Sequence, residues 1–107
     1  FLYVDDMASG SIHVMNLDAF KYQESVDPML SHINIGFGSD ITIADLAELI
    51  AKVIDYAGVI EFDSSKPDGS PKKLMDSSLI TRLNWRPLIS LEAGLASAYK
   101  SFLASHD

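Results

Sequence analysis

The chain has 107 residues, of which 48% are hydrophobic, and it carries 15 acidic against 8 basic residues for a formal net charge of −7. This composition is typical of one small folded domain or of part of a larger one. The acidic excess argues against a nucleic-acid binder, because such proteins neutralise phosphates with a basic face. The sequence contains no cysteine, which excludes disulfides and thiolate sites and fits a reducing, cytoplasmic location.

The first third of the chain predicts a strand, a helix and a second strand. The aromatic run "FLYV" at residues 1–4 is typical of a strand. Because the sequence opens inside this run without a methionine, we expect it to be a fragment of a longer chain. Asp5 and Asp6 are suited to capping a helix from residue 7 to about residue 20. A polar, proline-containing connection then leads to "SHINIG" (31–36), a second predicted strand.

The middle of the chain predicts a helix followed by a third strand. Thr42 is expected to cap a helix that runs to residue 57, and Gly58 fits the left-handed residue after its last turn. The apolar residues of this helix recur at helical spacing: Leu46, Leu49, Ile50, Val53, Ile54 and Ala57. "VIEF" (59–62) then predicts a strand. Residues 31–62 therefore indicate a βαβ unit with parallel strands.

The last third predicts a loop and two helices. The loop is "DSSKPDGSPKKLMD" at residues 63–76, and a short helix over about residues 77–84 follows until "NWRP" ends it. Ser90 is expected to cap the final helix, whose apolar stripe contains Leu91, Leu95, Ala98 and Phe102. The expected fold class is α/β, as a small helix-rich lobe with a short, mainly parallel sheet. The few strands of such a lobe would bury little core in a free-standing domain, so we expect the lobe to pack on a larger one.

Gly36 and Gly38 imitate a dinucleotide-binding fingerprint, because they lie between a predicted strand and a predicted helix. The third glycine position holds Ile41, which cannot give the close helix–strand contact that glycine gives. The turn before the helix is also long. We interpret these glycines as a structural turn and assign no cofactor-binding residue.

The other chemically suggestive residues favour packing over chemistry. The three histidines have no metal-ligand spacing and no triad signature, so we assign no metal ligand and no catalytic residue: His13, His32 and His106. Trp85 with Arg86 suggests a stacking platform or, in the interpretation we favour, an aromatic anchor at a helix end. The small side chains at residues 8–11 suit either a helix crossing or contact with a cofactor domain. Both interpretations of these residues stay open.

Three of the chain's 8 basic residues fall in the loop at residues 63–76: Lys66, Lys72 and Lys73. The prolines and glycine of this loop constrain its backbone, so the lysines are held on a preset turn. Asp68 is an acceptor that suits a ribose diol or a nucleobase N–H edge, and Lys72 and Lys73 are point charges that suit a phosphate. This combination predicts a nucleotide diphosphate site. The alternative is a solvated loop in which Lys66 and Asp68 balance each other.

The sequence also resembles a known family. "FLYVDDMASGSIHVM" resembles the start of the substrate-binding lobe of extended short-chain dehydrogenases/reductases that act on nucleotide sugars. "MLSHINIGFG", "SSKPDGSPKKLMD" and "ISLEAGLASAYKSFL" resemble the GDP-L-fucose synthases, which are bifunctional epimerase/reductases, and the similarity covers nearly the whole chain. The resemblance implies an NADPH-dependent enzyme with an N-terminal Rossmann domain. It places residues 1–107 in the C-terminal substrate-binding domain.

The same resemblance assigns roles to the lysine-bearing loop. It implies that Asp68 and Lys73 contact the nucleotide of a GDP-sugar, with Lys72 at a position where arginine is common in similar sequences. The family's Gly-rich NADP loop and its catalytic Ser, Tyr, Lys, Cys and His belong to the missing N-terminal part. We therefore expect the 107-residue chain to hold substrate, to be inactive alone and to bind no cofactor itself.

The expected partners are the GDP-sugar and the missing Rossmann domain, with no nucleic acid and no membrane. Apolar surface left uncovered by that domain favours self-association. Two alternatives stay open. One is a lobe of another nucleotide-sugar epimerase, dehydratase or reductase, and the other is a stand-alone nucleotide-binding or protein-interaction module.

Overall fold

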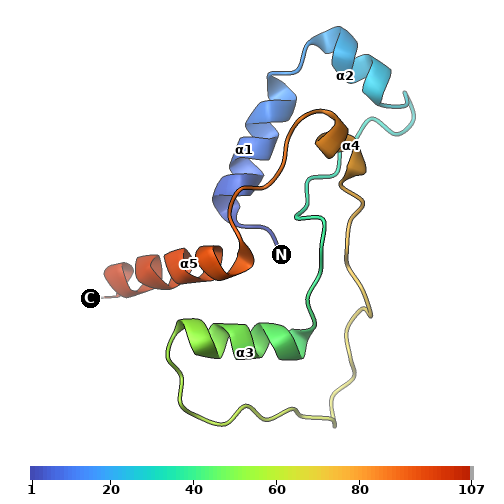
Figure 1. Cartoon of the computed structure of the whole chain (residues 1–107). Coiled ribbons are helices and arrows are strands. Elements are labelled where there is room, and N and C mark those ends of the chain that lie inside the picture. The colour runs from blue at the N-terminus through green and yellow to red at the C-terminus, as the bar shows by residue number, and fades with distance from the viewer. Residues whose placement is uncertain (107) are drawn as a thin grey trace. The chain divides into compact units, whose positions relative to one another are not determined.

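The computed structural model describes residues 1–106 and divides into two compact units. Unit 1 comprises Phe1–Ser39 and Leu74–Ile89, and unit 2 comprises Asp40–Lys73 and the chain from Ser90 onward. Unit 1 contains three helices, namely α1 (Val4–Met15), α2 (Ala19–Ser25) and α4 (Ser78–Arg82). Unit 2 contains α3 (Ile43–Val53) and α5 (Leu91–Ser105) (Figure 1).

The predicted strands do not form within residues 1–106. Residues 31–36 and 59–62 have no regular structure, and residues 1–4 consist of an irregular lead and the first residue of α1. A single isolated antiparallel bridge joins Asp27 and Leu30. An extended segment becomes a strand only when a neighbour completes its backbone hydrogen bonds, and none of these segments finds such a neighbour in the described residues. The helix-rich prediction is confirmed, whereas the parallel sheet is not found.

The single helix predicted from residue 7 to residue 20 is two helices. Asp18 interrupts it and acts as the N-cap of α2, because its carboxylate accepts hydrogen bonds from the backbone N–H groups of Phe20 and Lys21. The segment predicted as a polar connection is therefore partly helical. α1 has already ended at Met15 with Asn16 as its C-cap, and Asp18, whose backbone angles are non-helical, starts the second helix.

The interior of unit 1 is built where α1 meets the segment after α4. Trp85 is 7% exposed, and its indole Nε1 donates to Ser9 Oγ at 3.0 Å. A Cβ at Gly10 would lie 3.1 Å from the Trp85 ring and 2.9 Å from Ile35 Cγ2. The small side chains of α1 therefore admit a bulky tryptophan. This confirms the aromatic-anchor interpretation of Trp85 and gives Gly10 a packing role within unit 1.

The segment after α4 is fixed by a sharp helix end. α4 is shorter than predicted, and Asn84 follows it in the left-handed conformation at φ +67°. Asparagine tolerates this conformation better than most residues do, which explains why "NWRP" ends the helix. His13 of α1 donates from Nε2 to the carbonyl of Leu83 at 2.7 Å. The histidine thus has a structural partner at the end of α4.

A buried aspartate ties the start of α1 to the approach to α5. Asp6 is 3% exposed, and its carboxylate accepts the backbone N–H of Leu88 at 3.1 Å and that of Ile89 at 2.9 Å. The predicted capping role for Asp5 and Asp6 is wrong, since α1 begins earlier and its N-cap is Tyr3, without a side-chain cap. Asp6 instead pairs backbone groups more than eighty residues away along the chain.

Unit 2 is a packed pair of helices. α3 contacts α5, and Lys52 of α3 forms an ion pair with Glu92 of α5 at 2.9 Å. Both predicted N-caps are confirmed, because Thr42 accepts the N–H of Asp45 and Ser90 accepts that of Ala93. The apolar stripe of α5 is partly buried only in its first half, because Leu91 and Leu95 are half-buried but Ala98 and Phe102 are exposed.

The predicted end of α3 is four residues too late. The helix ends at Val53, and Asp55 adopts the left-handed conformation at φ +56° that we expected at Gly58. The N–H of Tyr56 then bonds the carbonyl of Ala51, which closes the helix end. An aspartate tolerates this conformation well enough that the glycine is not needed for it.

Replacing Asp6 with alanine should lower the free energy of unfolding by about 2 kcal/mol or more. The substitution leaves two backbone N–H groups without their charged acceptor. Asp5→Ala is the matched control, because Asp5 is exposed in the same helical turn and should lose only a dipole interaction of about 0.3–1 kcal/mol. Urea unfolding of both variants measures the difference. Equal destabilisation by the two substitutions would contradict the assigned role of Asp6.

Candidate functional site

The predicted ligand residues lie on an exposed segment of unit 2, residues 63–73, which we call the lysine loop. It contains no helix and no strand. Its first turn is closed by Asp63, whose Oδ1 accepts the N–H of Ser65 at 3.0 Å and the Ser65 hydroxyl at 2.6 Å. The loop therefore begins with a local carboxylate–backbone turn at residues 63–65, whereas the turn expected from its prolines and glycine is not formed at residues 67–70.

The three predicted ligand residues differ in their surroundings. Asp68 and Lys73 are exposed and make no hydrogen bond or ion pair through their side chains with any part of residues 1–106. Lys72 lies with its Nζ 3.8 Å from Asp40 Oδ2. No direct contact joins Asp68 to Lys73. Both side chains are available to a ligand, and their binding role stays a prediction.

The alternative pairing within the loop is not formed. Among the described residues, Lys66 and Asp68 do not make an ion pair. Lys66 instead donates a hydrogen bond from its backbone N–H to the carbonyl of Asp63. The lysine loop is thus not neutralised from within. Among the described residues, the one acidic partner of a lysine in this loop is Asp40, which comes from the segment before α3.

The glycine turn that imitates a dinucleotide site is packed at Gly36 and open at Gly38. A Cβ at Gly36 would lie 2.9 Å from Ser77 Oγ and 3.5 Å from the Met75 methyl carbon. Gly38 has φ +89°, which glycine adopts without strain. Because side chains of unit 1 cover Gly36, its backbone does not offer an open approach to a pyrophosphate. This favours the structural-turn interpretation.

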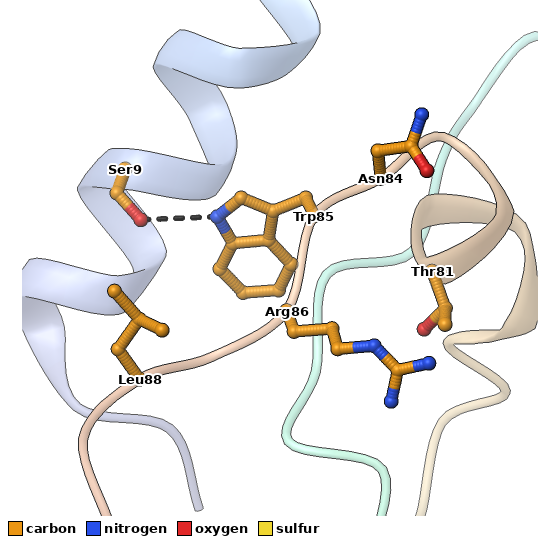
Figure 2. A pocket seen from close by; sticks show the side chains of 6 residues that line it. All are labelled: Ser9, Thr81, Asn84, Trp85, Arg86 and Leu88. Carbon is orange, nitrogen blue, oxygen red and sulfur yellow. Dashed lines mark hydrogen bonds between the residues drawn. The ribbon is translucent and has the colours of Figure 1, made fainter.

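Unit 1 has a cleft of about 520 Å³ beside the buried tryptophan. Figure 2 shows six side chains that line it: Ser9, Thr81, Asn84, Trp85, Arg86 and Leu88. The indole edge points to Ser9 on α1, and the Arg86 side chain extends away from α1 on the side of Thr81 (Figure 2). Because Trp85 is buried and held by this hydrogen bond, it does not form the stacking platform that its sequence position allowed.

Unit 2 has an apolar groove of about 330 Å³ along α3 and the segment that follows it. Its lining is almost entirely hydrocarbon and aromatic: Ala47, Ile50, Ala51, Ile54, Tyr56 and Ile60. Tyr56 is 54% exposed and Ile60 is 37% exposed. The groove provides apolar surface of the kind that favours self-association, which stays a prediction.

None of the helices in residues 1–106 has both the length and the apolar composition required to cross a bilayer. No group of three or more histidine, aspartate or glutamate side chains in this part of the chain is placed to hold a metal ion.

The comparisons with known proteins agree over the whole chain. The sequence is 56% identical over 107 residues to GDP-L-fucose synthase of Escherichia coli K12. It is 44% identical over 103 residues to probable GDP-L-fucose synthase 1 of Oryza sativa subsp. japonica. The chain is related to the GDP-L-fucose synthases. This confirms the predicted resemblance, although no protein-family model matches the sequence.

The relatives of this GDP-L-fucose synthase-like chain are much longer than the chain itself. The match to the Escherichia coli protein covers 100% of this chain but 33% of that protein, and the match to the rice protein covers 96% of this chain but 29% of that protein. It is also 32% identical over 103 residues to GDP-L-colitose synthase of Yersinia pseudotuberculosis, of which it covers 31%. The chain therefore spans about a third of the curated relatives it matches.

A solved structure extends the similarity to the fold. The crystal structure of a GDP-6-OMe-4-keto-L-xylo-heptose reductase from C. jejuni matches with a TM-score of 0.82 at 30% identity. The match covers 94% of this chain and 29% of the reductase. The arrangement of helices in this GDP-L-fucose synthase-like chain is thus found within a longer reductase.

Two carboxylates should titrate below their ordinary pKa of 3.8. Hydrogen bonds from the Ser65 hydroxyl and N–H lower the pKa of Asp63, and hydrogen bonds from Ser78 lower the pKa of Asp76. Because each folded-state pKa is depressed, the stability that these turns contribute is fully present above about pH 3.8 and is lost as the pH falls through the folded pKa. Carboxyl carbon chemical shifts measured against pH give both midpoints.

Ser65→Ala provides the internal control for this titration. It removes the hydroxyl bond to Asp63 and should raise the Asp63 midpoint toward 3.8, while Asp76 is unchanged. An Asp63 midpoint that starts at 3.8 or above, or that ignores the substitution, would show that the turn is absent in solution.

Proposed function

We propose that the chain is the C-terminal, substrate-binding domain of an NADPH-dependent GDP-L-fucose synthase-like epimerase/reductase. The proposal is carried by what the similar proteins have in common, which is a GDP-linked sugar specified in each name. GDP-L-fucose synthases, a GDP-L-colitose synthase and a GDP-linked heptose reductase all match nearly the whole chain. Each name specifies a GDP-linked sugar. The part common to them is therefore best assigned to holding that nucleotide.

In this proposal the lysine loop binds the GDP part of the substrate. Asp68 accepts hydrogen bonds from the nucleoside, and Lys73 with Lys72 neutralises phosphate oxygens. The proposal is supported by the exposure of all three side chains and by the absence of an internal partner for Asp68 and Lys73 within residues 1–106. The turn at Asp63 supports it further, because a partly ordered loop loses less entropy on binding.

The chemistry itself is assigned to residues outside this chain. The packing of Gly36 supports this assignment, since Ser77 and Met75 occupy the space where a pyrophosphate would approach that glycine. In the proposal NADPH is bound by an N-terminal Rossmann domain that also supplies the catalytic side chains. The 107-residue chain alone is then inactive. Its contribution is positional, because binding energy spent on the GDP orients the keto-sugar toward the reacting groups.

A second candidate is the same lobe in a related nucleotide-sugar enzyme. The GDP-L-colitose synthase at 32% identity and the heptose reductase at 30% identity favour it, because their names specify other sugars. The full coding sequence distinguishes the two candidates. A cysteine and a histidine in addition to a Ser/Tyr/Lys set would point to the epimerase/reductase.

In the complete enzyme, Lys73→Ala should raise KM for the GDP-sugar by about ten-fold to a hundred-fold with a much smaller change in kcat. A charge-assisted contact to a phosphate is made in the ground state and in the transition state alike, so its loss appears in KM. Steady-state kinetics measures both constants. Lys100→Ala is the matched control, because Lys100 is an exposed lysine of the same unit without an ion-pair partner in residues 1–106.

The two variants change the net charge equally, so a general electrostatic effect would act on both. A KM that is unchanged in Lys73→Ala, or raised equally in Lys100→Ala, would remove Lys73 from the site.

A further inference from the structure

The lysines of the lysine loop are not equivalent, because one of them already has an acidic partner. Lys72 Nζ lies 3.8 Å from Asp40 Oδ2. Within residues 1–106, neither Lys66 nor Lys73 has such a carboxylate. The loop therefore presents two ammonium groups that are free of protein acids and one that is occupied by Asp40.

Asp40 lies two residues before the N-cap of α3. Two residues later, Thr42 caps α3 by accepting the N–H of Asp45 at 3.0 Å. The carboxylate of Asp45 is itself engaged, because it accepts the Thr42 hydroxyl at 2.7 Å. Asp45 is thus committed to the helix start, and Asp40 is the acidic side chain of this segment that reaches the lysine loop.

The ion pair is built to be reversible. The Lys72 side chain is 64% exposed and that of Asp40 is 53% exposed. Water screens a pair of this kind, so it shifts an equilibrium by no more than about five-fold. A diphosphate carries more negative charge than one carboxylate and offers several acceptor oxygens to an ammonium group. It can therefore replace Asp40 at Lys72.

We propose that Asp40 is an internal competitor for phosphate at Lys72. It occupies the ammonium group in the ligand-free protein and is displaced when a nucleoside diphosphate binds the lysine loop. The proposal rests on the function proposed above. Its consequence is that Asp40 lowers the affinity for the nucleotide and adds a requirement for a ligand with enough negative charge to displace it.

GDP titrated into the complete protein tests this directly. Asp40→Asn keeps the size of the side chain and removes its charge, so the Kd for GDP should fall by about two-fold to five-fold at low salt. Asp55→Asn is the matched control. Asp55 is an exposed aspartate of unit 2 without an ion-pair partner in residues 1–106, and asparagine tolerates its φ of +56°. The control should change Kd by less than about 1.5-fold.

A second experiment, in a protein that already carries Lys72→Gln, distinguishes competition between Asp40 and phosphate from a change in the shape of the lysine loop. In Lys72→Gln, the carboxylate of Asp40 no longer has a charge to mask, so adding Asp40→Asn should leave Kd unchanged. Raising the salt should also shrink the effect seen with Lys72 present. An Asp40→Asn effect that equals the control, or that persists in Lys72→Gln, overturns the proposal.

Failure of this proposal and failure of the proposed function give different results. If Lys73→Ala weakens GDP binding while Asp40→Asn does nothing, the lysine loop binds the nucleotide and the competitor role is wrong. If Lys73→Ala also leaves the affinity for GDP unchanged, both the site and the competitor role are wrong.

Discussion

Aspartate carboxylates hold the irregular backbone of this chain in place. Residues 1–106 form no sheet, so backbone N–H groups outside the helices need other acceptors. Three aspartates accept such groups, namely Asp6, Asp27 and Asp63, and two more, Asp18 and Asp76, accept N–H groups in the first turns of α2 and α4. Of these, Asp6 is the buried one, and it joins segments from opposite ends of the sequence. Part of the acidic excess of the chain is therefore structural.

The same constraint shapes the candidate site. The lysine loop begins at the carboxylate turn of Asp63, and its second aspartate, Asp68, is left unpaired by any other part of residues 1–106. Lysines in a chain with a net charge of −7 have many potential acidic partners, yet Lys73 has none among the described residues. An acceptor and a cation left free on an exposed loop suit a polar, negatively charged ligand. In the proposed function this ligand is the GDP part of a nucleotide sugar, because the names of the similar proteins specify GDP-linked sugars.

Local signals in the sequence predict the helices well and the long-range contacts poorly. Thr42 and Ser90 are recognisable because a cap lies within three residues of the N–H that it accepts. The roles of Asp6 and Asp40 are invisible to such rules, since their partners are far away in the sequence. The predicted strands failed for the same reason, because β-propensity describes a segment but pairing requires a neighbour. The exposed loop was predicted from its prolines and glycine alone.

A crystal structure of the complete protein with GDP bound would test the central claim most directly. The account predicts that Lys73 Nζ lies within about 3 Å of a phosphate oxygen and that an Asp68 carboxylate oxygen accepts a hydrogen bond from the nucleoside. GDP bound elsewhere on the protein, with Asp68 and Lys73 still facing solvent, would contradict it.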